Sequence, residues 1–267
     1  MKSLRTVVEK LSRGKYIKRK ISVNGRHIPL LVSPDAQLKY LIPGKKSFDQ
    51  DLISIAETYL DVESNVWDIG ENVGVFTFAS ASVASNGTVV SVEADIWLAN
   101  LLKRTAGFNQ YADKNICVIP TAISKENSVA SFIVASRGRA SNSLETSSGL
   151  RSQMGGVREK QFVPTLTMDT LLTSLPKPDF IKIDIEGAEY MAIQGATKII
   201  NTIRPMFYIE IGHEVFPQIF AAFKEANYAA FDPAGKPLTT EAAFNVFFVP
   251  EEKIDDYHSC RLASLDF

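Results

Sequence analysis

A glycine-containing loop follows a short apolar segment and is the first feature that could bind a ligand. It reads Asp68-Ile69-Gly70-Glu71-Asn72-Val73-Gly74, and glycines at such a bend allow a tight turn and a close approach of the backbone to a ligand. The middle glycine of GxGxxG is missing, which counts against a dinucleotide, because that glycine lets the chain approach a pyrophosphate. The alternative is a turn that binds nothing. We assign to a cofactor site Asp68, whose carboxylate suits a cationic amino-acid group, with Gly70, Asn72 and Gly74.

An acidic residue after the next predicted strand points to a nucleoside. Glu93 lies 19 residues after Gly74, and an acid at this distance can accept hydrogen bonds from both hydroxyls of a ribose. Its other possible role, capping of the following helix, is better filled by Asp95. After the third predicted strand, Ala122 should lie beside an adenine and completes the predicted cofactor residues.

Five ionisable residues follow two later strands and could perform catalysis: Asp184, Glu186, Glu189, Glu210 and His213. Ligands bind where the carboxyl ends of parallel strands meet. In one interpretation Asp184 positions the cofactor or the acceptor while His213 or Glu210 removes a hydroxyl proton. In the other, Asp184, Glu186, Glu210 and His213 bind a divalent cation that acidifies the hydroxyl.

We favour the metal-free interpretation, because no ligand spacing is diagnostic of a metal. Glu186 and Glu189 could also be acids at the start of a helix, which the helix dipole favours. Lys182 is either a cation of the pocket or a lysine whose stem lies along apolar surface while its ammonium reaches water.

The surrounding pattern predicts the elements that would position these residues. Residues 16–32 suggest a hairpin with a type I′ turn at Asn24-Gly25, and a helix is expected over 48–60. Strands and helices then alternate, with strands expected over 66–69, 88–92, 116–119, 179–184, 206–211 and 243–249. This alternation predicts an α/β fold with a mostly parallel sheet and helices on both faces.

The segment between the third strand and residue 179 is less regular. A strand is expected over 129–134, whereas residues 137–156 are rich in Ser, Gly and Arg. Long loops in compact domains often bind or cover something, so this segment is either mobile near the substrate or a variable surface loop. We expect residues 1–60 to form an extension of basic helix, hairpin and helix that packs on a cofactor-binding domain over 61–267.

The composition of the chain limits the classes of partner that it could bind. The chain has 267 residues and a formal net charge of −1, which gives no overall attraction to nucleic acid. The basic N-terminal residues suit a phosphate-bearing or membrane-surface partner, but a solvated helix is the simpler interpretation. Neither a secretory signal nor a membrane span is expected, and two cysteines outside any CxxC arrangement fit a reducing cytoplasm.

The motifs together resemble the FkbM family of methyltransferases. The matching pieces span roughly residues 60 to 215 and are Asp68–Gly74, Ser91-Val92-Glu93, Asn142-Ser143-Leu144, residues 163–169 and Lys182-Ile183-Asp184-Ile185-Glu186-Gly187-Ala188-Glu189. The resemblance implies a Rossmann-like class I methyltransferase sheet, S-adenosylmethionine as cofactor, and O-methylation of hydroxyls, often on sugars. Glu71 departs from the family's usual alanine and Ala94 from its usual proline, and Glu71 could alter the charge of the cofactor pocket.

The leading hypothesis is therefore an O-methyltransferase for a small hydroxylated acceptor, a saccharide or glycosylated metabolite. An NAD-linked oxidoreductase is disfavoured by the glycine pattern. A nucleic-acid methyltransferase is disfavoured by the near-neutral charge and by the lack of interleaved aromatic and basic residues. A non-catalytic small-molecule-binding domain is disfavoured by the intact carboxylates. The oligomeric state stays open.

Overall fold

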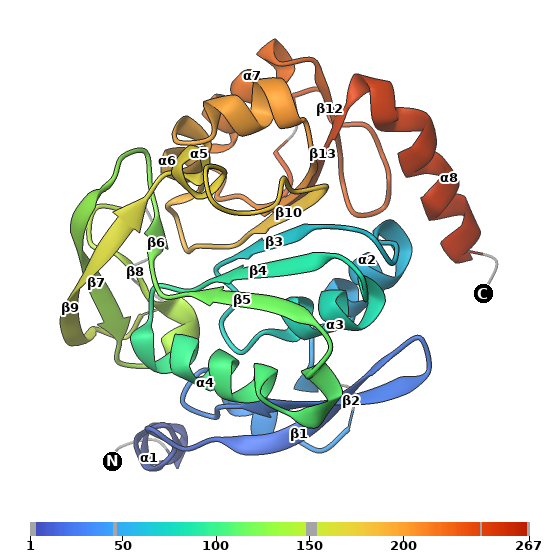
Figure 1. The fold of residues 1–267 in the computed structure, drawn as a ribbon. Coiled ribbons are helices and arrows are strands. Elements are labelled where there is room, and N and C mark those ends of the chain that lie inside the picture. The colour runs from blue at the N-terminus through green and yellow to red at the C-terminus, as the bar shows by residue number, and fades with distance from the viewer. Residues whose placement is uncertain (1–3, 45–46, 148–153, 241, 266–267) are drawn as a thin grey trace.

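The computed structural model describes residues 4–44, 47–147, 154–240 and 242–265. Within these residues, the strands form a seven-stranded sheet, a four-stranded sheet and a two-stranded hairpin. Helices cover both faces of the large sheet, and the smaller sheet stands at its side (Figure 1). The predicted α/β architecture is confirmed.

The large sheet has the order β12-β13-β11-β10-β3-β4-β5. Neighbouring strands from β11 to β5 are parallel, and β13 is antiparallel to both of its neighbours. The chain order reverses between β3 and β10, which creates a crevice at their carboxyl ends. The strands are β3 (Val66–Ile69), β4 (Thr88–Val92), β5 (Asn115–Ile119), β10 (Phe180–Ile183), β11 (Met206–Glu210), β12 (Tyr228–Phe231) and β13 (Asn245–Pro250).

Two layers of helices explain why the central strands are apolar on both faces. All residues of β3 and β10 are buried, as is typical of parallel strands with helices on either side. One layer holds α2 (Gln50–Tyr59), α3 (Val75–Val83) and α4 (Ile96–Ala106). The other holds α5 (Met168–Leu171), α6 (Glu189–Gln194) and α7 (Phe216–Glu225) (Figure 1).

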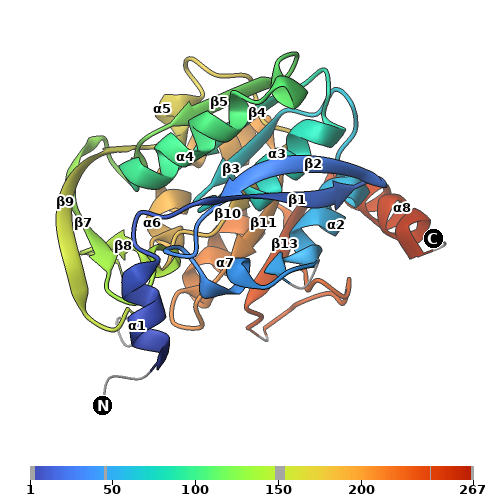
Figure 2. The same cartoon turned by 90° about the horizontal axis from the view of Figure 1, so that it is seen from below.

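The N-terminal region lies against the first of these layers. It consists of α1 (Leu4–Leu11), β1 (Ile17–Val23), β2 (Arg26–Val32) and η1 (Leu38–Leu41). Asn24 and Gly25 have φ angles of 46° and 73°, so the predicted type I′ turn is confirmed. The hairpin crosses α3 and α4 (Figure 2), and the Leu31 backbone N–H donates to Thr105 Oγ1 at 3.0 Å.

The smaller sheet holds most of the segment that the sequence left irregular. Its order is β6-β9-β7-β8, with β6 (Ala122–Ile123), β7 (Ser128–Ala135), β8 (Ser143–Leu144) and β9 (Val157–Leu166). The short helix η4 (Arg139–Ser141) precedes β8. The expectation of an unstructured loop is therefore wrong for residues 137–147, because polar contacts between distant residues order them. Residues 148–153 lie outside the described residues.

Other boundaries differ where local composition misleads. After β10, the apolar residues that could form one long helix are divided at Gly195 into α6 and the π-helical η5 (Ile199–Ile203). The elements that were not predicted from the sequence include β12, the short η3 (Asn109–Tyr111), and the C-terminal η6 (Glu251–Lys253) and α8 (Ile254–Leu265). No helix within the described ranges combines the length and the apolar character needed to cross a bilayer.

Candidate functional site

A pocket opens where β3, β4 and β10 end. Five of the predicted cofactor residues line it: Gly70, Asn72, Glu93, Ala122 and Asp184. The apolar part of its wall includes Leu98, Ile123, Phe132 and Leu144. The structure thus brings together residues from four separate stretches of the chain at the predicted edge of the sheet, whereas Asp68 and Gly74 lie outside the lining.

The two glycines of the loop are required by packing. Gly70 has a φ of +80°, and a Cβ at this position would lie 1.9 Å from the Asp184 carbonyl oxygen. Gly74 has a φ of +84°, and its Cβ would lie 2.5 Å from Leu102 Cδ2. A side chain at either position would therefore push the loop away from the end of β10 or from α4. Only glycine allows both the positive φ angle and the close contact of the loop with these elements.

Glu93 faces the pocket from the end of β4 and is 7 % exposed. Its Oε2 accepts the Asn72 backbone N–H at 3.1 Å and its Oε1 accepts the Asp95 N–H at 2.7 Å. Burial raises the pKa of Glu93 to about 8, although these backbone donors oppose the shift. Each oxygen keeps a lone pair, so the carboxylate can accept further hydrogen bonds. Asp95 caps α4 through bonds from Trp97 N and Leu98 N, as predicted.

Beneath the loop, Lys182 joins it to the acidic strand end. Its ammonium donates to the Gly70 carbonyl at 2.9 Å and lies 3.4 Å from Asp68 Oδ1 and 3.5 Å from Asp184 Oδ2. Burial lowers the pKa of Lys182, but Asp68 and Asp184 raise it by more than burial lowers it, so the net shift is upward. Lys182 is 3 % exposed and lines the second cavity described below. Of the two interpretations, the buried cation therefore agrees with the structure and the lysine that reaches water does not.

Two buried carboxyls lie behind the pocket rather than in it. Asp68 is fully buried, and its Oδ2 accepts from Thr77 Oγ1 at 2.6 Å. Glu71 accepts from Ser91 Oγ at 2.6 Å, and burial, then Asp68 and Glu93, raise its pKa well above the usual range. Neither lines the pocket, so Asp68 can reach a ligand there only indirectly and Glu71 adds no wall charge.

A second cavity of about 380 Å³ adjoins the first on the α2 side of the sheet. Asp184 lines both cavities. The second one is also lined by Asp49, Asp51, Leu52, Lys182, Ile183, Tyr208, Glu210 and Asn245. Burial, followed by Asp184 and Glu186, raises the pKa of Glu210 to about 8. A carboxyl group whose pKa lies close to neutral pH is therefore located next to the wall shared by the two cavities.

The remaining predicted catalytic residues occupy different places. Glu186 lines the first pocket, and burial, with Asp184 and Glu189, raises its pKa to about 7. Glu189 is buried and accepts the backbone N–H groups of Ile185 and Gly187 at 3.1 and 3.0 Å, so it shapes the loop before α6. His213 is exposed in the turn after β11 and lines neither cavity.

The side chains proposed for a divalent cation are not gathered around one point. Among the described residues, no three or more His, Cys, Asp or Glu side chains form a group that could hold a metal ion. Asp184, Glu186, Glu210 and His213 thus do not make the metal site of the alternative interpretation, since Glu186 and Glu210 belong to different cavities.

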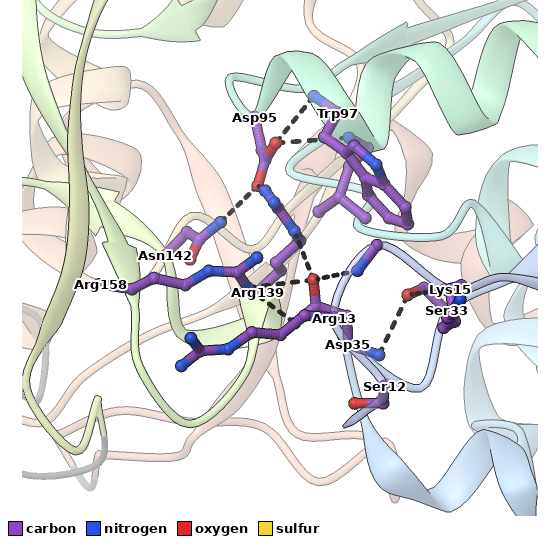
Figure 3. A network of polar contacts seen from close by, with 12 residues as sticks. Ser12, Arg13, Lys15, Ser33, Asp35, Asp95, Trp97, Arg139, Asn142 and Arg158 are labelled. Carbon is purple, nitrogen blue, oxygen red and sulfur yellow. Dashed lines mark hydrogen bonds and ion pairs between the residues drawn. The ribbon is translucent and has the colours of Figure 1, made fainter. Parts of the chain in front are cut away.

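Arg139 and Asn142 line the first pocket but were not identified as site residues from the sequence. The Arg139 guanidinium donates from Nε to Asp35 Oδ2 at 3.0 Å and from Nη1 to Asp95 Oδ2 (Figure 3). Asn142 Nδ2 donates to the same Asp95 oxygen at 2.7 Å. The Asn142-Ser143-Leu144 motif could have pointed to this part of the pocket wall. Nothing in the sequence, in contrast, distinguishes the buried Arg139 from the arginines that lie on the surface.

Comparison with known proteins identifies one family. The family model described as "Methyltransferase FkbM domain" matches residues 68–230, a range that includes every residue that lines the first pocket. A search among curated proteins finds no match.

Solved structures offer distant similarities. An FkbM methyltransferase from Methylobacillus flagellatus is 17 % identical with a TM-score of 0.45, covering 73 % of this chain and 47 % of its own. The chain thus spans about half the length of that protein. An S-adenosylmethionine-dependent O-methyltransferase from Thermotoga maritima is 11 % identical with a TM-score of 0.44, covering 87 % and 77 %. A T. thermophilus 16S rRNA methyltransferase is 14 % identical with a TM-score of 0.46, covering 88 % and 50 %.

Proposed function

Because the chain belongs to the FkbM family of S-adenosylmethionine-dependent methyltransferases, we propose that it methylates a hydroxyl of a small acceptor, a saccharide or glycosylated metabolite. The family implies S-adenosylmethionine as cofactor and a Rossmann-like class I sheet. One observation carries the finer proposal: Asp184 forms a wall shared by the first pocket and a second, acidic cavity. A donor and an acceptor held in these cavities would meet at that wall.

The residues of the first pocket fit the proposed cofactor. Glu93 offers a carboxylate for the two ribose hydroxyls, and Ala122 lies with Ile123 and Phe132 in an apolar wall suited to a base. Asn72 Oδ1 is buried, and no group among the residues that the structure describes donates a hydrogen bond to it, although buried polar atoms are normally paired. A ligand that donates a hydrogen bond, such as an amine or a hydroxyl, would satisfy this oxygen.

The acidic groups of the pocket favour a cationic ligand over a pyrophosphate. Glu93, Asp184 and Glu186 line it, and a bound cation would stabilise their ionised forms, while the charge of Arg139 is shared between Asp35 and Asp95. The Asn72 N–H, which could face a phosphate at the start of α3, instead donates to Glu93. These features disfavour an NAD-linked oxidoreductase. Nucleic acid as acceptor is disfavoured separately by the formal net charge of −1, which gives no overall attraction to phosphates.

In the proposed mechanism, S-adenosylmethionine when bound supplies an electrophilic methyl group on a cationic sulfur. Asp184 orients the donor side and the acceptor side of the shared wall, and such positioning can contribute several kcal/mol (about 7–11 in well-oriented cases). Glu210 takes the proton of the attacking hydroxyl, for which its pKa of about 8 is suitable. His213 stays a second candidate base, although it is exposed and would need a substrate that extends to the turn after β11.

We further propose that the cofactor residues are Asp68, Gly70, Asn72, Gly74, Glu93, Ala122 and Asp184, with Asp68 and Gly74 acting through the shape of the loop.

Both cysteines are free, Cys117 half-buried and Cys260 exposed, which suits the reducing cytoplasm that we propose as the compartment. The domain boundary near residue 60 also stays a proposal.

The experiment is incubation of the protein with isotopically labelled S-adenosylmethionine and a panel of glycans and hydroxylated metabolites, followed by mass spectrometry. We expect one labelled methyl group on an acceptor oxygen, lost in Asp184→Asn. Binding of S-adenosylhomocysteine without transfer to any acceptor would favour the non-catalytic domain, and tight binding of NADH in its place would refute the proposal. Chelator treatment followed by magnesium addition tests the metal-dependent alternative in the same assay.

A further inference from the structure

A buried network of ion pairs connects the N-terminal region to the first pocket (Figure 3). Asp35, Asp95 and Arg139 are 4 %, 0 % and 7 % exposed. The Arg139 guanidinium lies between the two carboxylates and over the Trp97 ring, 4.9 Å from its centroid. Charged groups at this depth are costly unless they are paired, so the three residues depend on one another for their positions.

The network also fixes the chain on both sides of the pocket wall. Asp35 accepts from Arg158 of β9 at 2.8 Å and from the Gly14 backbone N–H at 3.1 Å. The backbone N–H of Arg139 donates to the Asp35 carbonyl at 2.9 Å. A side chain at Gly138 would collide with the Ala36 carbonyl, since its Cβ would lie 2.7 Å away. The N-terminal region and residues 138–142 are therefore held as one unit.

A short series of bonds leads from this unit to the proposed ribose acceptor. Arg139 and Asn142 hold Asp95 Oδ2, while the other Asp95 oxygen caps α4. The Asp95 backbone N–H in turn donates to Glu93 Oε1 at 2.7 Å. A shift of Arg139 would thus move Asp95, and Asp95 would carry Glu93 with it.

We propose that Arg139 is a positioning residue of the cofactor pocket and that Asp35, from the N-terminal extension, holds it in place. The identity of the ligand rests on the function proposed above. In this arrangement the extension is part of the cofactor site although it lies outside the matched family region, because residue 35 supplies a carboxylate that the region 68–230 does not contain.

The test measures the Kd of S-adenosylhomocysteine by calorimetry for the full chain and for Arg139→Gln, Asp35→Asn and the double variant. We expect each single variant to bind at least about tenfold more weakly, equivalent to about 1.4 kcal/mol, and the double variant to be no weaker than Arg139→Gln. At saturating cofactor, kcat should stay within about twofold, because neither residue touches the acceptor cavity. Asp35→Glu, which keeps the charge, should recover part of the affinity.

One control separates positioning from general stability. Glu252→Gln breaks the ion pair with Arg204, in which the two contacts are 2.6 and 2.8 Å long and which lies outside both cavities. This variant should lower the melting temperature with little change in Kd. A Kd within about twofold of wild type for Arg139→Gln would overturn the proposal, and additive losses in the double variant would overturn the role of Asp35.

Trp97 provides a readout that is independent of the ligand. The fluorescence of Trp97 should change when the Arg139 guanidinium no longer lies over its ring. We expect the same change in Arg139→Gln, which removes the guanidinium, and in Asp35→Asn, which releases it, with Trp97→Phe used to assign the emission. If wild type binds no S-adenosylhomocysteine, the proposed function fails, and the fluorescence still decides whether Asp35 holds Arg139. Unchanged emission in Asp35→Asn would then refute that coupling.

Discussion

Replacement of Glu93 by glutamine tests the assignment of the ribose site. The variant keeps the size of the side chain but removes the charge that two ribose hydroxyls would meet. A hydrogen bond to a charged group contributes about 1.5–3 kcal/mol, which corresponds to a loss of roughly 10- to 150-fold in affinity. We expect the weakened binding to be at the lower end, because the amide oxygen can still accept one of the two backbone N–H groups, from Asn72 or Asp95.

The assay is calorimetric titration with S-adenosylhomocysteine between pH 6.5 and 9. Burial raises the pKa of Glu93 to about 8, so the free protein holds the protonated acid at neutral pH. A hydroxyl donates best to the ionised form, and affinity should therefore rise with pH until about 8 and then level off. The variant has no group to ionise at this position, so the difference between the two curves isolates Glu93 from the titration of the ligand itself.

Glu71→Gln is the matched control, since Glu71 is also buried but does not line the pocket. It should leave Kd within about twofold and should not reduce stability, because it replaces a carboxyl whose charged form burial disfavours. If Glu93→Gln binds as tightly as wild type, or if Glu71→Gln weakens binding as much, the ribose does not lie at Glu93 and the orientation of the cofactor must be reversed or moved.

The remaining predictions concern the loop, the base and stability. Gly70→Ala should lower the unfolding free energy by at least about 2 kcal/mol and abolish cofactor binding, whereas Gly107→Ala, whose nearest atoms lie at 3.5 Å, should be neutral in thermal unfolding and titration. Glu210→Gln should slow transfer by about 10²–10⁴-fold and remove the rise in rate toward pH 8 that follows from its raised pKa; an unchanged profile would leave His213 as the base. Burial raises the pKa values of Glu93 and Glu210 to about 8 and of Glu186 to about 7, so the folded protein retains protons that the unfolded chain loses near pH 4.5. Stability should fall as pH rises from about 4.5 to about 8, which chemical denaturation at a series of pH values can measure.

The fold was largely predictable because its signals are local. Apolar segments such as Val66–Ile69 and Thr88–Val92 became strands with the expected bounds, since parallel strands between two helix layers must be apolar on both faces. The smaller sheet was not predictable from such patterns. Half of the residues of its longest strand, Val157–Leu166, are exposed, and they include both charged and apolar side chains in no regular alternation. Its partners in β7 lie 22 to 37 positions earlier in the chain.

The same distinction applies to the site. Gly70, Glu93 and Asp184 could be predicted because each directly follows a strand, and the ends of parallel strands meet at one edge. The role of Lys182 stayed open between a pocket cation and a solvated lysine, because its partner Asp68 comes from a different strand and only the register between β10 and β3 places the two residues side by side. Arg139 was missed because its partner Asp35 is 104 residues away.

Lys182 also explains why the glycine loop and the acidic strand end act as one unit. Gly70 packs directly on the Asp184 carbonyl, and Lys182 binds the Gly70 carbonyl from below while it balances Asp68 and Asp184. One buried cation thus opposes two buried or half-buried carboxylates, and Glu93, Glu186 and Glu210 around them have raised pKa values. The crevice therefore contains more acidic than basic groups, and the positive charge of a sulfonium would balance part of this excess. The proposed cofactor is therefore more compatible with this crevice than its neutral product, a difference that would favour product release after each transfer.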